Sequence, residues 1–141
     1  MKSSTWLRIA ALVTALQGIG HLIGQPWTPG KDVLSAGVVA AMQAHEMHVM
    51  GFDRSYFDFY VGFGWDLGVF VAVQAVLLWQ LAGLAQAEPA RVRPAVAVFF
   101  AANLVLTGLN ARFLFTAPLV TTAAIALCLA LALLPARARA A

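Results

Sequence analysis

Four long apolar stretches, separated by shorter polar segments, dominate the pattern of positions along this chain. Each is long enough, as a helix, to cross the ~30 Å hydrocarbon core of a bilayer. The pattern predicts membrane-spanning helices over about 4–24, 55–83, 94–112 and 116–134. A fifth stretch, over about 32–50, is shorter and becomes polar toward its end. With Asp32 as its N-cap, it predicts an interfacial or re-entrant helix between the first two spans.

Composition agrees with this pattern. Hydrophobic residues make up 62% of the chain and charged residues 11%, and the mean hydropathy is +0.83, whereas an average soluble domain is roughly 25% charged. We therefore expect an integral membrane protein of the all-α class, a four-transmembrane-helix bundle forming one domain over residues 1–141. A cleaved leader ending near Ala15 is the alternative for the first stretch, although the apolar run continues beyond it.

The basic residues indicate an orientation. With four spans, both termini and the loop after the second span lie on one side, together with Lys2, Arg8, Arg91, Arg93, Arg137 and Arg139. The other side carries Lys31, Arg54 and Arg112. Because cytoplasmic loops are enriched in Lys and Arg, we predict cytoplasmic termini in a bacterial cytoplasmic membrane. The expected partners are the lipid bilayer and, if the chain self-associates, further copies of itself; we expect no nucleic-acid partner.

The stretch 51–68, GFDRSYFDFYVGFGWDLG, concentrates the polar chemistry. It leads into an apolar span and yet carries Asp58 and Asp66. An ionisable group within a membrane is costly and normally faces a protein interior or a water-filled cavity. We therefore predict a functional pocket bordered by both carboxyls.

Depth along the predicted helices arranges the other polar groups around these two. Gln17, Asp66 and Asn103 fall near the bilayer centre, and a second layer further out contains Asp58, His21 and Asn110, with Tyr60 and Arg112 close by. The alternative is that Asp66 and Asn103 only hydrogen-bond between helices. We expect catalytic roles for Asp58, Asp66 and His21, with one carboxyl as acid and the other as base. The expected substrate-binding residues are Gln17, His45, Glu46, His48, Arg54, Tyr60, Trp65, Asn103, Asn110 and Arg112.

A metal centre is a weaker interpretation. His45 and His48 would share one face of the predicted helix 32–50, but their spacing is not that of HExxH and no cysteine lies nearby. The only cysteine, Cys128, lies in the last apolar stretch, which excludes a disulfide within the chain. We predict neither a metal nor a cofactor. We expect Gln43, His45, Glu46 or His48 to contact the mouth of the pocket instead.

The run Gly51-x-x-Arg54-Ser55-Tyr56-x-Asp58-Phe59-Tyr60-x-Gly62-Phe63-Gly64, with four spans and a histidine near the end of the first, resembles a group of small, uncharacterised bacterial four-helix membrane proteins. More loosely, the architecture resembles DoxX-like and emopamil-binding-like membrane proteins. The resemblance implies a shared fold and pocket, and it assigns no reaction to any residue.

Three classes of function fit these residues. The first is a cofactor-independent membrane enzyme whose carboxyl groups isomerise, cyclise or open the epoxide of a lipid-soluble small molecule. The second is a non-catalytic binding or accessory protein for a quinone, pigment or lipid. The third is an ion- or proton-coupled carrier, which would need an oligomer because four helices are few for a transport path.

Overall fold

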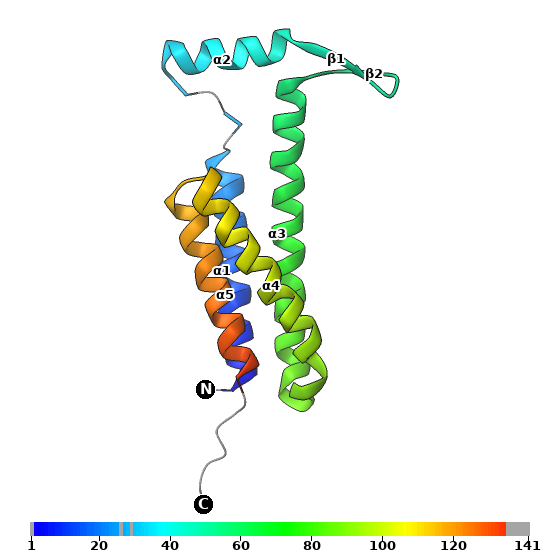
Figure 1. The fold of residues 1–141 in the computed structure, drawn as a ribbon, viewed down its shortest axis with the longest axis vertical. Helices are drawn as coiled ribbons and strands as arrows, with labels where there is room; N and C mark the ends of the chain where they lie inside the picture. Colours follow the sequence, from blue (N-terminus) through cyan, green and yellow to red (C-terminus); the bar gives the residue numbers. More distant parts are fainter. Residues whose placement is uncertain (1, 26, 29, 135–141) are drawn as a thin grey trace, which may run out of the picture. The chain divides into compact units, whose positions relative to one another are not determined.

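The computed structural model describes residues 2–25, 27–28 and 30–134. Its elements, in chain order, are α1 (Ser3–Gly24), α2 (Val33–Ala44), β1 (Glu46–Val49), β2 (Phe52–Ser55), α3 (Tyr56–Ala87), α4 (Pro89–Phe113) and α5 (Thr116–Leu133) (Figure 1). Helices account for most of the chain, so the predicted all-α class with four long helices and one short helix is confirmed. Arg137 and Arg139 lie outside the described residues.

Four of these helices, α1, α3, α4 and α5, are long and apolar enough to cross a membrane. Many of their large apolar side chains point outward and are exposed, among them Leu16, Phe70 and Leu127. Soluble monomers rarely expose contiguous apolar surface on this scale. The helices are therefore typical of a membrane protein whose outer surface faces lipid.

The connection between α3 and α4 is much shorter than predicted. Residues up to Ala87 belong to α3, and α4 begins at Pro89, so Glu88 alone separates them. The helix that contains the third predicted span therefore begins five residues before residue 94, and Pro94 lies inside α4 and not in its first turn as expected. Proline is accepted at the first helical position because the N–H it lacks would have no partner there, and Pro89 fills this role.

The predicted helix over 32–50 was correct only in its first part. Asp32 caps α2 as expected: its side chain accepts hydrogen bonds from the hydroxyl and backbone N–H of Ser35, which hold the pKa of Asp32 below its ordinary value. The helix ends at Ala44, and residues 46–55 form an antiparallel hairpin. Met50 and Gly51 both have positive φ angles, of 51° and 87°, as a two-residue hairpin turn requires.

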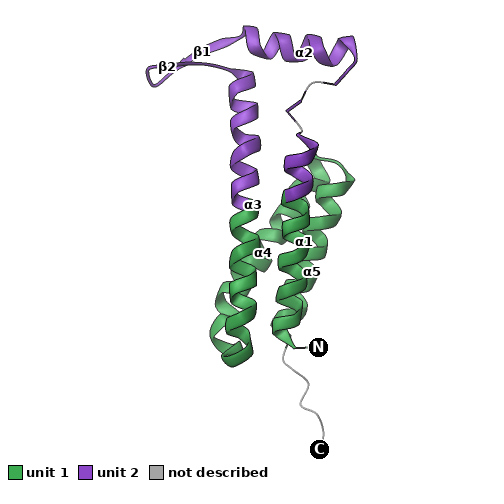
Figure 2. Cartoon of the chain, turned by 180° about the vertical axis from the view of Figure 1, so that it is seen from behind, with its two compact units in different colours: residues 1–18, 71–141 green, residues 19–70 purple. Residues whose placement is uncertain are grey.

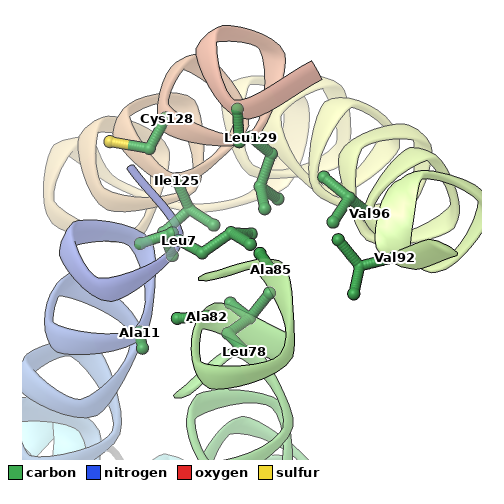
Figure 3. Packing of buried hydrophobic residues seen from close by; sticks show 12 residues of the cluster. Leu7, Ala11, Leu78, Ala82, Ala85, Val92, Val96, Ile125, Cys128 and Leu129 are labelled. Atoms are coloured by element: carbon green, nitrogen blue, oxygen red, sulfur yellow. The ribbon is translucent and has the colours of Figure 1, made fainter. Parts of the chain in front are cut away.

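The chain divides into two compact units: unit 1 contains residues 1–18 and 71–141, and unit 2 contains residues 19–70 (Figure 2). The described core of unit 1 draws on all four long helices and includes Leu7, Leu78, Val92 and Leu129 (Figure 3). Alanines such as Ala82 supply much of the rest. Small side chains let helix backbones approach closely, which is how helices associate in lipid.

Candidate functional site

The first turns of α3 present an open groove on one side of the helix. Within unit 2 its volume is about 330 Å³, and its lining residues are Arg54, Asp58, Phe59, Gly62, Phe63 and Asp66. Phe59, Gly62, Phe63 and Asp66 follow the i, i+3, i+4, i+7 spacing that places residues on one helix face. We call this the carboxylate groove. It brings together the two aspartates that the sequence analysis singled out.

Asp58 has a structural task at the start of α3. One of its carboxylate oxygens, Oδ2, accepts hydrogen bonds from the backbone N–H of Ser55 at 2.8 Å and from the Ser55 hydroxyl at 2.9 Å. In return, the backbone N–H of Asp58 donates to Ser55 Oγ at 3.1 Å. This reciprocal pair is a capping box, here with Asp in the place usually held by Glu. Asp58 therefore fixes the first turn of α3 as well as bordering the groove.

Asp66 lies two turns further along the same face. Its side chain is exposed, and it makes no hydrogen bond or ion pair with the described residues of unit 2. Arg54, at the end of β2, borders the same groove and donates a hydrogen bond from its guanidinium to the backbone oxygen of Asp53. The groove thus contains two carboxyl groups, one guanidinium and two phenylalanine rings.

The opposite side of α3 is closely packed. Gly64 lies under the indole of Trp27, so that a Cβ added there would be 2.6 Å from Cζ3 of that ring. One turn further along, Gly68 packs against Leu22 in the same way. The Gly64-x-x-x-Gly68 spacing therefore marks a real close contact, whereas Gly20 and Gly24 have open space where a Cβ would lie.

His21 belongs to this packed side. Its Nε2 is 2.8 Å from the carbonyl oxygen of Gly64, and because a carbonyl only accepts, Nε2 must be the donor. The imidazole meets the Trp27 ring edge-on, and Trp27 in turn stacks obliquely on Trp65, with ring centroids 5.2 Å apart. His21 thus ties the end of α1 to α3, and it is not one of the residues that line the carboxylate groove.

A second open groove, of about 290 Å³, lies against α2 in unit 2. Apolar residues dominate its lining, which consists of Trp27, Thr28, Gly30, Leu34, Ser35, Val38, Val39, Met42 and Tyr60. Tyr60 therefore borders this groove and not the carboxylate groove.

Of the four residues considered for the pocket mouth, Gln43 lies in the last turn of α2, and the other three lie in or beside the hairpin. The prediction that His45 and His48 share one face of a helix was wrong. His45 follows the last residue of α2, whereas His48 lies in β1. His45 stacks on Tyr56, and His48 Nδ1 is 2.8 Å from an oxygen of Asp53 on the facing strand. Glu46 pairs in register with Ser55. Among the described residues, no three potential ligands gather as a metal site requires.

The predicted polar residues of α4 have partners within unit 1. Asn103 donates to the carbonyl of Phe99 at 2.8 Å and accepts a long hydrogen bond of 3.4 Å from Gln74 of α3. Asn110 donates to Thr122 and to the carbonyl of Pro118, both in α5. Both asparagines are buried and connect helices. For Asn103, this is the contact between helices that the alternative interpretation expected.

Two further residues that were predicted to bind substrate also lie in unit 1. Gln17 is half-buried in α1, and the guanidinium of Arg112 lies over the ring of Phe113. The expected cavity shared by these residues, the asparagines and the two aspartates stays a prediction.

Sequence reasoning missed three groove residues and one interhelical partner. Phe59, Gly62 and Phe63 lie on the same helix face as Asp66, a spacing that can be read from the sequence. The capping box at Ser55 could be found from its S-x-x-D spacing. Gln74 was not singled out, although it lies as far from the predicted end of the second span as Asn103 lies from the predicted start of the third.

Comparison with known proteins found no matching family model, no matching curated protein and no matching solved structure. The resemblance to DoxX-like and emopamil-binding-like proteins therefore stays a prediction.

Proposed function

We propose that this chain is an integral membrane protein that binds a lipid-soluble small molecule in the carboxylate groove. The single observation that carries the proposal is that Asp66, within an apolar span, borders an open groove together with Arg54, Asp58 and two phenylalanines. An ionisable side chain within a span is costly unless a polar partner meets it. A ligand whose polar head reaches Asp66 supplies such a partner.

The groove also indicates which kind of head it would accept. Two carboxyl groups against one guanidinium leave an excess of negative charge when all three are ionised. Such an arrangement favours a head that is positively charged or that donates hydrogen bonds. The rings of Phe59 and Phe63 provide apolar and π surface for the remainder of the molecule, and such surface also attracts cations.

A pair of probes with the same shape and opposite charge tests this proposal. Tetraphenylphosphonium and tetraphenylborate both dissolve in lipid and differ in the sign of their charge. We expect saturable binding of the phosphonium to the protein in lipid nanodiscs, above its partition into empty nanodiscs, and only partition for the borate. Equal behaviour of the two ions, or no saturable binding of either, would contradict the proposal.

Carboxyl catalysis is the second candidate, and the shared groove of Asp58 and Asp66 is the observation in its favour. In this reaction class one carboxyl protonates the substrate while the other removes a proton, as an isomerase, cyclase or epoxide hydrolase requires. The Asp66→Asn variant distinguishes the two candidate functions. An enzyme would lose turnover of its substrate in this variant even where binding of that substrate survives.

We also propose that both termini are cytoplasmic and that the membrane is the bacterial cytoplasmic membrane. The predicted excess of basic residues on the terminal side supports this orientation. The hydrogen bond from the Ser3 hydroxyl to the carbonyl of Ala132 joins the first turn of α1 to the last turn of α5, which agrees with both of these turns lying on the same side of the membrane, whichever side that is.

Cysteine labelling tests the orientation. In a Cys128→Ala background, a membrane-impermeant maleimide added to intact cells should label Thr28→Cys and spare Ala90→Cys. Lysed cells should show labelling at both positions, which controls for accessibility. Labelling of Ala90→Cys in intact cells would reverse the orientation.

A further inference from the structure

The hairpin formed by β1 and β2 is amphipathic across its two faces. Side chains directly opposite each other in an antiparallel pair lie on the same face, and the faces alternate along the strands. One face therefore carries the pairs Glu46–Ser55 and His48–Asp53. The other face carries the pairs Met47–Arg54 and Val49–Phe52. The first face is polar throughout, whereas the second is apolar except for one arginine.

The contacts within the hairpin agree with this division. His48 and Asp53 pair at 2.8 Å on the polar face. On the apolar face, the guanidinium of Arg54 lies over the ring of Phe52, 5.3 Å from its centroid. An arginine that lays its stem along apolar surface and keeps its charge at the edge is typical of a membrane interface.

Met47 is partly buried, but the rest of the apolar face near the turn is uncovered. Phe52 is 61% exposed, Val49 is 41% exposed, and Met50 at the turn is 95% exposed. A two-stranded hairpin is marginally stable in water unless its apolar face packs against something. The hairpin therefore needs an apolar surface beyond the described residues of unit 2.

Chain connectivity identifies that surface. The hairpin begins two residues after α2 and continues directly into Tyr56, the first residue of α3. Because α1 ends at Gly24 and both α1 and α3 are long enough to span, residues 25–55 join two spans and stay at one membrane face. α2 has only 12 residues and is too short to cross. Lipid is thus the apolar phase that the hairpin meets wherever this chain is inserted.

We propose that the hairpin is an interfacial anchor that inserts Val49, Met50 and Phe52 into the boundary between headgroups and acyl chains. The polar face, with His48 and Asp53, remains in water. Arg54 then lies at headgroup depth, and because it also borders the carboxylate groove, the anchor holds the mouth of that groove at the lipid interface. The anchor itself does not depend on the proposed ligand binding.

Spin labels on the two faces test the anchor. The full-length chain, with Cys128→Ala, would be labelled in turn at Val49→Cys, Phe52→Cys, His48→Cys and Asp53→Cys and reconstituted into phosphatidylethanolamine and phosphatidylglycerol vesicles. Oxygen concentrates in lipid, whereas a nickel chelate stays in water. Labels at positions 49 and 52 should lose most of their collisions with nickel and gain collisions with oxygen, and labels at 48 and 53 should show the reverse.

Three results would overturn the anchor. Nickel access at all four positions would place the whole hairpin in water. Protection from both reagents at 49 and 52 would mean that protein covers the apolar face. A separate variant, His48→Cys with Asp53→Cys, checks the hairpin itself, because these residues are cross-strand neighbours; failure of this pair to form a disulfide on mild oxidation in the same vesicles would remove the hairpin and the proposal with it.

Discussion

Asp66→Asn is expected to weaken tetraphenylphosphonium binding by about tenfold or more, because it removes a negative charge that meets the cation in surroundings of low dielectric. The amide is nearly the same size as the carboxyl, so the shape of the groove and the helix are preserved. Binding of the probe to the variant in nanodiscs, measured by equilibrium dialysis against wild type, gives the ratio directly.

Asp53→Asn is the matched control, since it removes the same charge from a side chain on the polar face of the hairpin that does not line the carboxylate groove. It also keeps the backbone oxygen to which Arg54 donates. We expect this control to bind the probe nearly as well as wild type. Arg54→Gln should bind it more tightly, because a positive charge leaves the groove. Equal losses in Asp66→Asn and Asp53→Asn would show that general surface charge, and not the groove, attracts the probe.

Leu78→Ala is expected to lower the free energy of unfolding by about 2 kcal/mol, because it leaves a cavity in the core of unit 1. Leu78 is 0% exposed and lies in α3 among residues of the other three long helices (Figure 3). Lipid is as apolar as leucine, so the transfer contribution that dominates in water largely cancels. The expected loss of stability therefore comes from the van der Waals contacts that the leucine side chain makes in the core. Unfolding in mixed micelles with increasing sodium dodecyl sulfate measures the change.

The neighbouring residue provides the control for this substitution. Leu77 lies in the same helix but is 41% exposed, so Leu77→Ala changes helix propensity equally and leaves no internal cavity. We expect its effect to stay below about 0.5 kcal/mol, the usual range for surface substitutions. If both variants lose the same stability, the contacts of the Leu78 side chain do not hold the bundle together.

The number and kind of the long helices follow from the sequence alone. An uninterrupted apolar run of about 20 residues has few alternatives to a helix, because backbone groups in lipid must be satisfied within the segment. The observed bounds of α1, Ser3–Gly24, and of α5, Thr116–Leu133, lie within one residue of the predicted spans at each end. Local cap chemistry was equally readable, as the hydrogen bonds of Asp32 show.

The hairpin was not predicted because its sequence fits two periods at once. Met47 and Met50 are spaced as on a helix, and the alternation Glu46-Met47-His48-Val49 is that of a strand. The usual hairpin signal, Asn-Gly or Asp-Gly, is replaced here by Met-Gly, with methionine in a left-handed conformation. Only the pairing of the two strands decides between the periods, and pairing is a tertiary property.

The candidate site was predictable in part. Asp58 and Asp66 were singled out because ionisable groups are costly within a span, and they do border one groove. The other predicted site residues were chosen because they lie at a similar depth in the membrane, and that depth was counted from the predicted first residue of each helix. Since α4 starts at Pro89 and not at residue 94, Asn103 lies further along its helix than assumed, and it hydrogen-bonds Gln74 across the tight α3–α4 connection.

By itself, therefore, the sequence determined the class of the protein, its four apolar helices and the two aspartates, because hydropathy, helix length and the cost of an intramembrane charge act locally along the chain. The tertiary structure decided which partner each polar group meets. His21 is held by the carbonyl of Gly64 and Asn110 by Thr122. A hydrogen bond forms only within about 3.5 Å, and a distance of that size between residues far apart in sequence is set by packing, which hydropathy along one helix does not encode.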